Sequence, residues 1–309
     1  MSIATRSLFP AAALLVSLAM PALAQAEEGY DLVFDRPHEA GARYTVSGEA
    51  HISEEMQQRV NGQATESQST ASEINLEGVV EVLAVNETGG VTQLAMTVGE
   101  YDIEINDQGV ELQQDRRIIG AVEGDEAQYR YENGDAIEGE LAELLDIFLD
   151  DLLDDEGEAE DPDRIMNIDG PKSPGDRWAM DHAYMVQSAV EVGQLSLDAD
   201  KMESEVHFVE LNEDNDFGTA MAVIAMSMRA EDFSFPSDDF PEWLAIKESY
   251  IEMEGGGMLA IDPEMHRSRH DVEMEMAFLA SGEVPGQGAQ VEVEFEAHRR
   301  SSVTLSEMP

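Results

Sequence analysis

The 309-residue chain has no cysteine, only 17 Lys and Arg, and 6% aromatic residues. Without cysteine it can form neither disulfides nor thiolate metal sites, and it lacks a thiol nucleophile. The few bases face 67 Asp and Glu, which gives a formal net charge of −50. Such a charge repels the phosphate backbone, so we expect no nucleic-acid partner.

Long apolar runs are also missing beyond the N-terminus. Residues 1–24 have the pattern of a cleavable signal peptide: Arg6 is the only charge, an apolar stretch follows, and small residues end it at Ala22-Leu23-Ala24. No second long apolar stretch follows, so we expect a chain that does not span a membrane after cleavage. The sequence predicts an exported protein, periplasmic or extracellular, with a mature formal charge of −51 because only Arg6 is lost.

Lysine is scarcer than arginine, with only Lys172, Lys201 and Lys247 present. An excess of acids with few lysines looks like the composition of proteins from salty surroundings, where carboxylates stay hydrated and screened. We interpret the acids as an adapted surface. With 67 acids, pairs of carboxylates arise from composition alone and do not indicate acid–base catalysis.

Alternation of apolar and polar residues dominates the mature sequence. It is clearest at Val272, Met274, Met276 and Phe278, and it recurs from Val291 to Ala297. This period of two predicts antiparallel strands with one face on a core and one in water. Asn and Gly between the runs, as at Asn61-Gly62, predict hairpin turns. The expected strands lie near residues 30–35, 43–59, 72–85, 91–105, 109–120, 177–190, 204–212, 217–230, 248–254, 258–262, 268–280 and 289–300.

One segment has helical spacing instead. Between Glu138 and Asp155, leucines and Phe148 recur on one face while acids occupy much of the rest, which predicts an amphipathic helix. Its acidic end opposes the helix dipole, so it would fray or hold a cation. A second, short helix is expected after Ser237, where Phe240, Trp243 and Leu244 follow an N-cap.

Two parts of the chain resemble each other. Gly41-Ala42-Arg43-Tyr44 is echoed by Gly175-Asp176-Arg177-Trp178, which suggests a duplicated all-β unit. The expected organisation is a signal peptide (1–24), a first β half (25–137), the acidic helix and loop (138–163) and a second β half (164–309), with the halves forming one unit. The fold class is therefore mainly β: a curved or partly closed antiparallel sheet with one acidic helix.

These echoes, the hairpins at Asn86-Glu87 and Asn212-Glu213, and the element Gly256-Gly257-Met258-Leu259-Ala260-Ile261-Asp262 together resemble a family of secreted bacterial proteins of unknown function. A curved sheet with helix cover is also similar to the periplasmic lipoprotein carriers. That likeness implies an apolar concavity for acyl chains, at the level of the fold alone.

Hydrolase and phosphate-loop motifs are absent. Gly255-Gly256-Gly257 lacks the lysine and helix of a phosphate loop and predicts a bulge or tight bend between strands. The Asn212 to Gly218 segment begins like an EF-hand loop, but Phe217 occupies the glycine position, so we expect a polar turn. Met226 with Met228, and Met274 with Met276, would each share a strand face and could serve as copper ligands, but methionines that alternate in this way are more typical of a core. His266 and His270 are expected to be solvated.

The sequence thus favours an exported, non-catalytic envelope protein that binds a lipid-like ligand or a protein partner. The alternative is an acidic surface or matrix protein that depends on weakly bound calcium; an enzyme is least expected, and no other cofactor is predicted. Candidate residues lining an apolar site are Leu145, Phe148, Leu152, Met226, Met228, Met274 and Met276. Candidate cation ligands are Asp150, Asp151, Asp154, Asp155 and Glu156.

Overall fold

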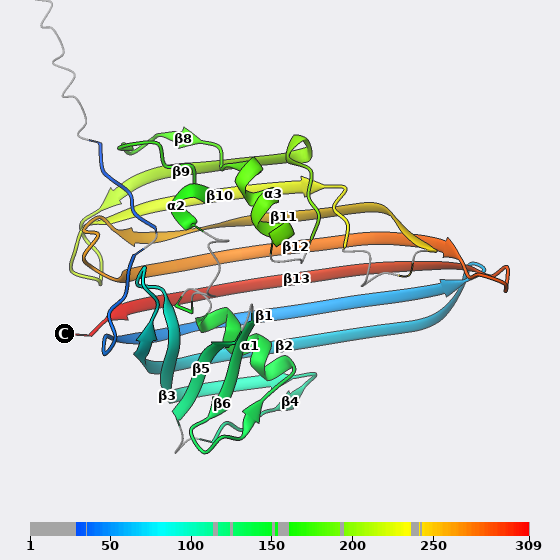
Figure 1. Ribbon diagram of the computed structural model, residues 1–309, viewed down its shortest axis with the longest axis horizontal. Helices are drawn as coiled ribbons and strands as arrows, with labels where there is room; N and C mark the ends of the chain where they lie inside the picture. The colour runs from blue at the N-terminus through cyan, green and yellow to red at the C-terminus, as the bar shows by residue number, and fades with distance from the viewer. Residues whose placement is uncertain are drawn as a thin grey trace, which may run out of the picture.

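A computed structural model of the chain describes residues 29–34, 36–113, 117–123, 126–149, 152–153, 161–191, 195–235, 241 and 243–308. Its main feature is a single open antiparallel sheet of 13 strands (Figure 1). The strands are β1 (Arg43–Val60), β2 (Gln63–Val85), β3 (Val91–Ile105), β4 (Gln108–Gly109), β5 (Arg117–Glu123), β6 (Glu126–Tyr131), β7 (Ala136–Ile137), β8 (Arg177–Trp178), β9 (Met202–Asn212), β10 (Met221–Glu231), β11 (Leu244–Ala260), β12 (Arg267–Glu283) and β13 (Gln290–Glu307).

Sequence-distant strands meet in the middle of this sheet. The order is β7-β6-β5-β3-β2-β1-β13-β12-β11-β10-β9-β8, with β4 paired to β3. The β1–β13 ladder runs from Tyr44 opposite Glu307 to Val60 opposite Val291. This ladder joins the N-terminal and C-terminal parts of the chain into one sheet. The mainly β, antiparallel fold class predicted from alternation is confirmed.

The helices lie on one side of the sheet (Figure 1). They are α1 (Glu140–Leu149), α2 (Pro162–Ile165) and α3 (His182–Glu191), with a 3₁₀ turn, η1 (Ala199–Lys201). Buried residues of α1 and of β1, β2, β3, β5 and β6 form one core cluster. A smaller cluster lies at β9 and β10, where Met166 and Met185, from α2's end and α3, pack on it. The sheet therefore carries two separate cores on the same face.

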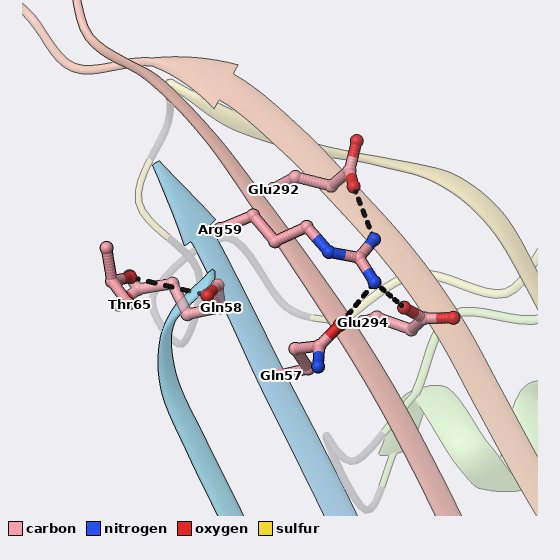
Figure 2. Close-up of polar contacts among 6 residues, drawn as sticks. All are labelled: Gln57, Gln58, Arg59, Thr65, Glu292 and Glu294. Atoms are coloured by element: carbon pink, nitrogen blue, oxygen red, sulfur yellow. Dashed lines mark hydrogen bonds and ion pairs between the residues drawn. The ribbon is translucent and has the colours of Figure 1, made fainter. Parts of the chain in front are cut away.

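Register divides every strand between that inner face, defined as the face shared with buried Tyr44, and an outer face. The outer face carries most of the charge of the strands, and some of it lies in ion pairs. Arg59, for example, contacts Glu292 at 3.0 Å and Glu294 at 3.4 Å and also donates to Gln57 (Figure 2). Exposed pairs of this kind contribute little stability each. Their role here is to interleave positive charge with carboxylates.

Residues 177–190 were predicted as a strand, and this is wrong. Only Arg177–Trp178 is β, and α3 occupies His182–Glu191. Asp181 caps the helix, since its Oδ1 accepts from the Tyr184 backbone N–H at 3.0 Å. Tyr184 and Ser188, four residues apart, are both buried. The N-cap and this spacing were the signals for a helix.

The bend predicted at Gly255-Gly256-Gly257 is also wrong. Strand β11 is continuous through the three glycines, which pair in register with Val272, Asp271 and His270 of β12. The two strands expected at 248–254 and 258–262 are therefore one. Leu244, expected in a short helix after Ser237, begins this strand; residues 236–240 lie outside the described residues.

Other boundaries moved as well. Helix α1 ends at Leu149, not at Asp155, because Leu153 leaves it to bridge Val91 in parallel. The strand expected at 30–35 is reduced to a bridge between Tyr30 and Lys172. The strand expected at 109–120 is replaced by β4 and β5, and strands β6 and β7 were not predicted. Asn61 and Gly62 both have positive φ, which confirms their turn.

The predicted signal peptide, 1–24, lies outside the described residues, and duplication of the two β halves stays a prediction. No helix in the described ranges is long and apolar enough to cross a membrane.

Candidate functional site

Half-buried apolar side chains cover the inner face of the central strands. On β12, Met274 lies opposite Met253 of β11, which lies opposite Met228 of β10. Other rows join Met276 to Ile251 and to Ala297. We call this surface the inner-face patch and define it as Met228, Ile251, Met253, Met274, Met276, Phe278, Phe295 and Ala297. Ile251 is buried and the other members are half-buried.

Position in the fold explains why the patch is only half-buried. The larger core lies mainly on strands β1 to β6, where α1 packs, and reaches β13 only near Val303 and Leu305; the smaller core lies at β9 and β10. Within the described part of the chain, only Met253 of the patch is packed against a core cluster. The patch thus extends between the two cores as an apolar surface with no core of its own.

A run of aromatic rings connects the patch to a hollow. Phe278 stacks on Phe295 with centroids 5.1 Å apart, and Phe235 meets Phe278 edge-on at 5.3 Å. Phe235 in turn contacts buried Phe233 at 5.5 Å. Phe233 and Phe235 line a hollow of about 530 Å³ with Lys201, Asp232, Leu244 and Ile246 among its other walls. The apolar surface therefore continues from the sheet into a concave feature.

The residues proposed to line an apolar site fall into two groups. Met228, Met274 and Met276 lie in the patch, and Met226 adjoins it on β10, facing Gly255. Leu145, Phe148 and Leu152 are instead fully buried in the larger core, with Phe148 only 1% exposed. The structure thus brings the methionines together and places Leu145, Phe148 and Leu152 apart from them, in the packed core around α1.

The proposed cation ligands Asp150, Asp151, Asp154, Asp155 and Glu156 lie outside the described residues. In the part of the chain that is described, no group of three or more His, Asp or Glu side chains is placed to hold a metal ion. The turn after Asn212 is held by the side-chain amide of Asn215, which donates to the backbone carbonyls of Asn212 and Thr219 at 2.7 and 2.8 Å.

A titratable cluster at one end of the sheet was missed. His38 Nδ1 and the Tyr44 hydroxyl share a hydrogen bond of 2.8 Å, and the His38 and His266 rings lie 4.5 Å apart. Burial, then the neighbouring His266, lowers the pKa of His38 to about 4, and burial raises the pKa of Tyr44 to about 12. Burial also lowers the pKa of His266, which is half-buried rather than solvated as predicted.

This cluster predicts acid sensitivity. The unfolded chain protonates His38 near pH 6.5 but the folded protein only near pH 4, so the unfolded state binds more protons between these values. The contribution of His38 to the free energy of unfolding should therefore be fully present above pH 6.5. The free energy of unfolding should fall by about 2–3 kcal/mol as the pH drops to 4. Urea unfolding from pH 7 to pH 4 should show a shallower loss for His38→Gln than for the native protein. The control His51→Gln, at an exposed site, should keep the native slope; identical slopes for all three proteins would refute the role of His38.

No family model and no curated protein matches this chain. Among solved structures, lipovitellin is similar over 88% of this chain at 7% identity, with a TM-score of 0.29; the chain spans 25% of the lipovitellin chain. The outer membrane protein OprG from Pseudomonas aeruginosa is similar at 7% identity (90% of this chain, 100% of that chain, TM-score 0.18). An outer membrane channel from Pseudomonas putida F1 is similar at 8% identity (91% of this chain, 98% of that chain, TM-score 0.21). All three are distant structural neighbours, and likenesses this low say nothing about ligands. The resemblance to a secreted bacterial family stays a prediction.

Proposed function

We propose that this protein is an exported, non-catalytic envelope protein that binds an apolar, lipid-like ligand on the inner-face patch. The observation that carries the proposal is the cross-strand row of Met228, Met253 and Met274 beside the Phe278–Phe295 stack. Contiguous, partly exposed apolar surface on a soluble protein marks an interaction site. Unbranched methionines suit ligands of irregular shape because their side chains adapt.

The distribution of charge supports the same proposal. On β12 the inner positions Met274 and Met276 alternate with the outer positions Glu273 and Glu275. The hydrated carboxylates of the outer face favour solubility, while the inner face stays apolar and free to bind a ligand. Small-molecule sites are usually concave and have mainly apolar walls. The hollow lined by Phe233 and Phe235 adds such a concave feature at one end of the inner-face patch.

Titration with the uncharged dye N-phenyl-1-naphthylamine tests the proposal. The native protein should show saturable fluorescence enhancement, and Met276→Gln should weaken binding about 5- to 10-fold because it places an amide in the apolar surface. Ala277→Gln is the matched control, since it adds the same group at the next position, on the outer face. The proposal fails if the native protein does not bind the dye, or if both variants weaken binding equally.

A further inference from the structure

Arg299 is an exception to the charge distribution of the sheet. The register places it on the inner face, opposite Met274 of β12 on one side and Ile52 of β1 on the other. Its same-face neighbours along β13 are Ala297 and Ser301. No other Lys or Arg that has a register partner in the described strand ladders faces inward; Lys247 falls at the bulge of β11 and lines the hollow beside Phe235. A guanidinium therefore lies at the edge of the inner-face patch, next to Met274 and Ala297.

Several arginines of the outer face form ion pairs, whereas Arg299 does not. Arg117 contacts Glu81 at 2.6 Å, and Arg229 contacts Glu252 at 2.8 Å. Arg299 is half-buried and has no ion pair within the residues that the structure describes. The nearest inward-facing acid by register is Glu54, two positions along β1 from Ile52, and it is exposed. A partly desolvated cation without a partner costs free energy, which an incoming anion would recover.

We propose that the ligand of the inner-face patch is a long-chain fatty acid whose carboxylate binds Arg299. This inference rests on the function proposed above and names its substrate class. The guanidinium offers two parallel N–H donors that match a carboxylate. Phe295 lies four residues from Arg299 on the same strand and face, roughly 13 Å away at about 3.3 Å per residue. An acyl chain can run over that distance past Ala297 and Met276 to the Phe278–Phe295 stack.

The net charge of the protein sharpens the inference. With a formal charge of −50, the molecule as a whole repels anions. An anionic head group therefore needs a local cation, and Arg299 is the one that the register places beside the patch methionines. A neutral amphiphile would gain nothing from this arginine. The structure thus predicts discrimination by charge and not only by chain length.

Two fluorescent probes of equal chain length test this: cis-parinaric acid and its methyl ester, titrated against the purified protein at pH 8. The native protein should bind the acid about 10-fold more tightly than the ester. Arg299→Gln should weaken binding of the acid about 10-fold and change binding of the ester less than about 2-fold. Arg299→Lys keeps the positive charge but loses the two parallel N–H donors of the guanidinium. Its affinity for the acid should therefore lie between those of the native protein and Arg299→Gln.

Arg300→Gln provides the matched control because residue 300 is adjacent in sequence but exposed on the outer face, opposite Glu273. It removes the same charge and should leave both affinities unchanged. Equal affinity of the native protein for acid and ester, or equal effects of Arg299→Gln and Arg300→Gln, would overturn the carboxylate assignment while leaving the apolar site intact. Failure of both probes to bind would instead refute the proposed function itself.

Discussion

Replacing Arg36 with methionine is expected to lower the free energy of unfolding by about 3–5 kcal/mol. The Arg36 side chain is only 8% exposed and donates to four backbone carbonyls. Its Nε donates to Val33 at 3.0 Å, and its Nη2 donates to Ala260 at 2.5 Å. Its Nη1 donates to Asp262 at 3.1 Å and to Met265. Methionine would fill similar space but leave these carbonyls without their donor.

The size of this effect follows from what Arg36 connects. It lies in the segment before β1 and ties that segment to the connection between β11 and β12, more than 220 residues away in sequence. Urea unfolding measures the change. Arg36→Lys should lose an intermediate amount, and Arg43→Met, at an exposed position, should change stability by less than about 0.5 kcal/mol. A loss for Arg36→Met no larger than for Arg43→Met would contradict the role of these hydrogen bonds.

Gly257→Ala is expected to destabilise the protein by about 3 kcal/mol or more. A Cβ at position 257 would lie 2.0 Å from the carbonyl oxygen of Arg269 and 3.1 Å from its carbonyl carbon, both in the neighbouring backbone. Backbone atoms cannot rotate away as the end of a side chain can. The β11–β12 ladder would have to separate locally, beside the inner-face patch.

The chain offers a graded series for this test. A Cβ at Gly255 would lie 2.7 Å from the nearest backbone oxygen, so Gly255→Ala should lose less than Gly257→Ala. At Gly109 nothing lies within 4 Å, and Gly109→Ala should be within about 0.5 kcal/mol of the native protein in urea unfolding. Equal stability of all three variants would show that the close approach of β11 and β12 is not what requires glycine.

Much of the candidate site could be predicted from alternation alone. The inward direction of Met274, Met276 and Phe278 follows from the period of two, because successive side chains point to opposite faces of a sheet. The sequence could not separate Leu145 and Phe148 from these residues. Both sets are apolar, and which set is enclosed depends on where α1 packs.

For Arg299, the same alternation predicts the face: continued two residues past Ala297, it puts residue 299 on the apolar face and residue 300 on the other. Only the strand pairing shows that Met274 and Ile52 lie opposite Arg299. The titratable cluster was missed for a related reason: His38 and His266 are more than 200 residues apart, and the end of the sheet brings their rings to 4.5 Å. The α3 segment was predicted as a strand, although Asp181 supplies an N-cap that favours a helix.

By itself, the sequence determined the mainly β class, strands β1, β12 and β13 of the centre and the separation of acids from apolar residues, because these depend on local geometry and on the affinity of each side chain for water. The tertiary structure alone decided that β1 pairs with β13, that α1 encloses one core and that the methionine surface between the cores stays half-buried. Those features depend on contacts between segments far apart in the chain, whose pairing no local pattern specifies.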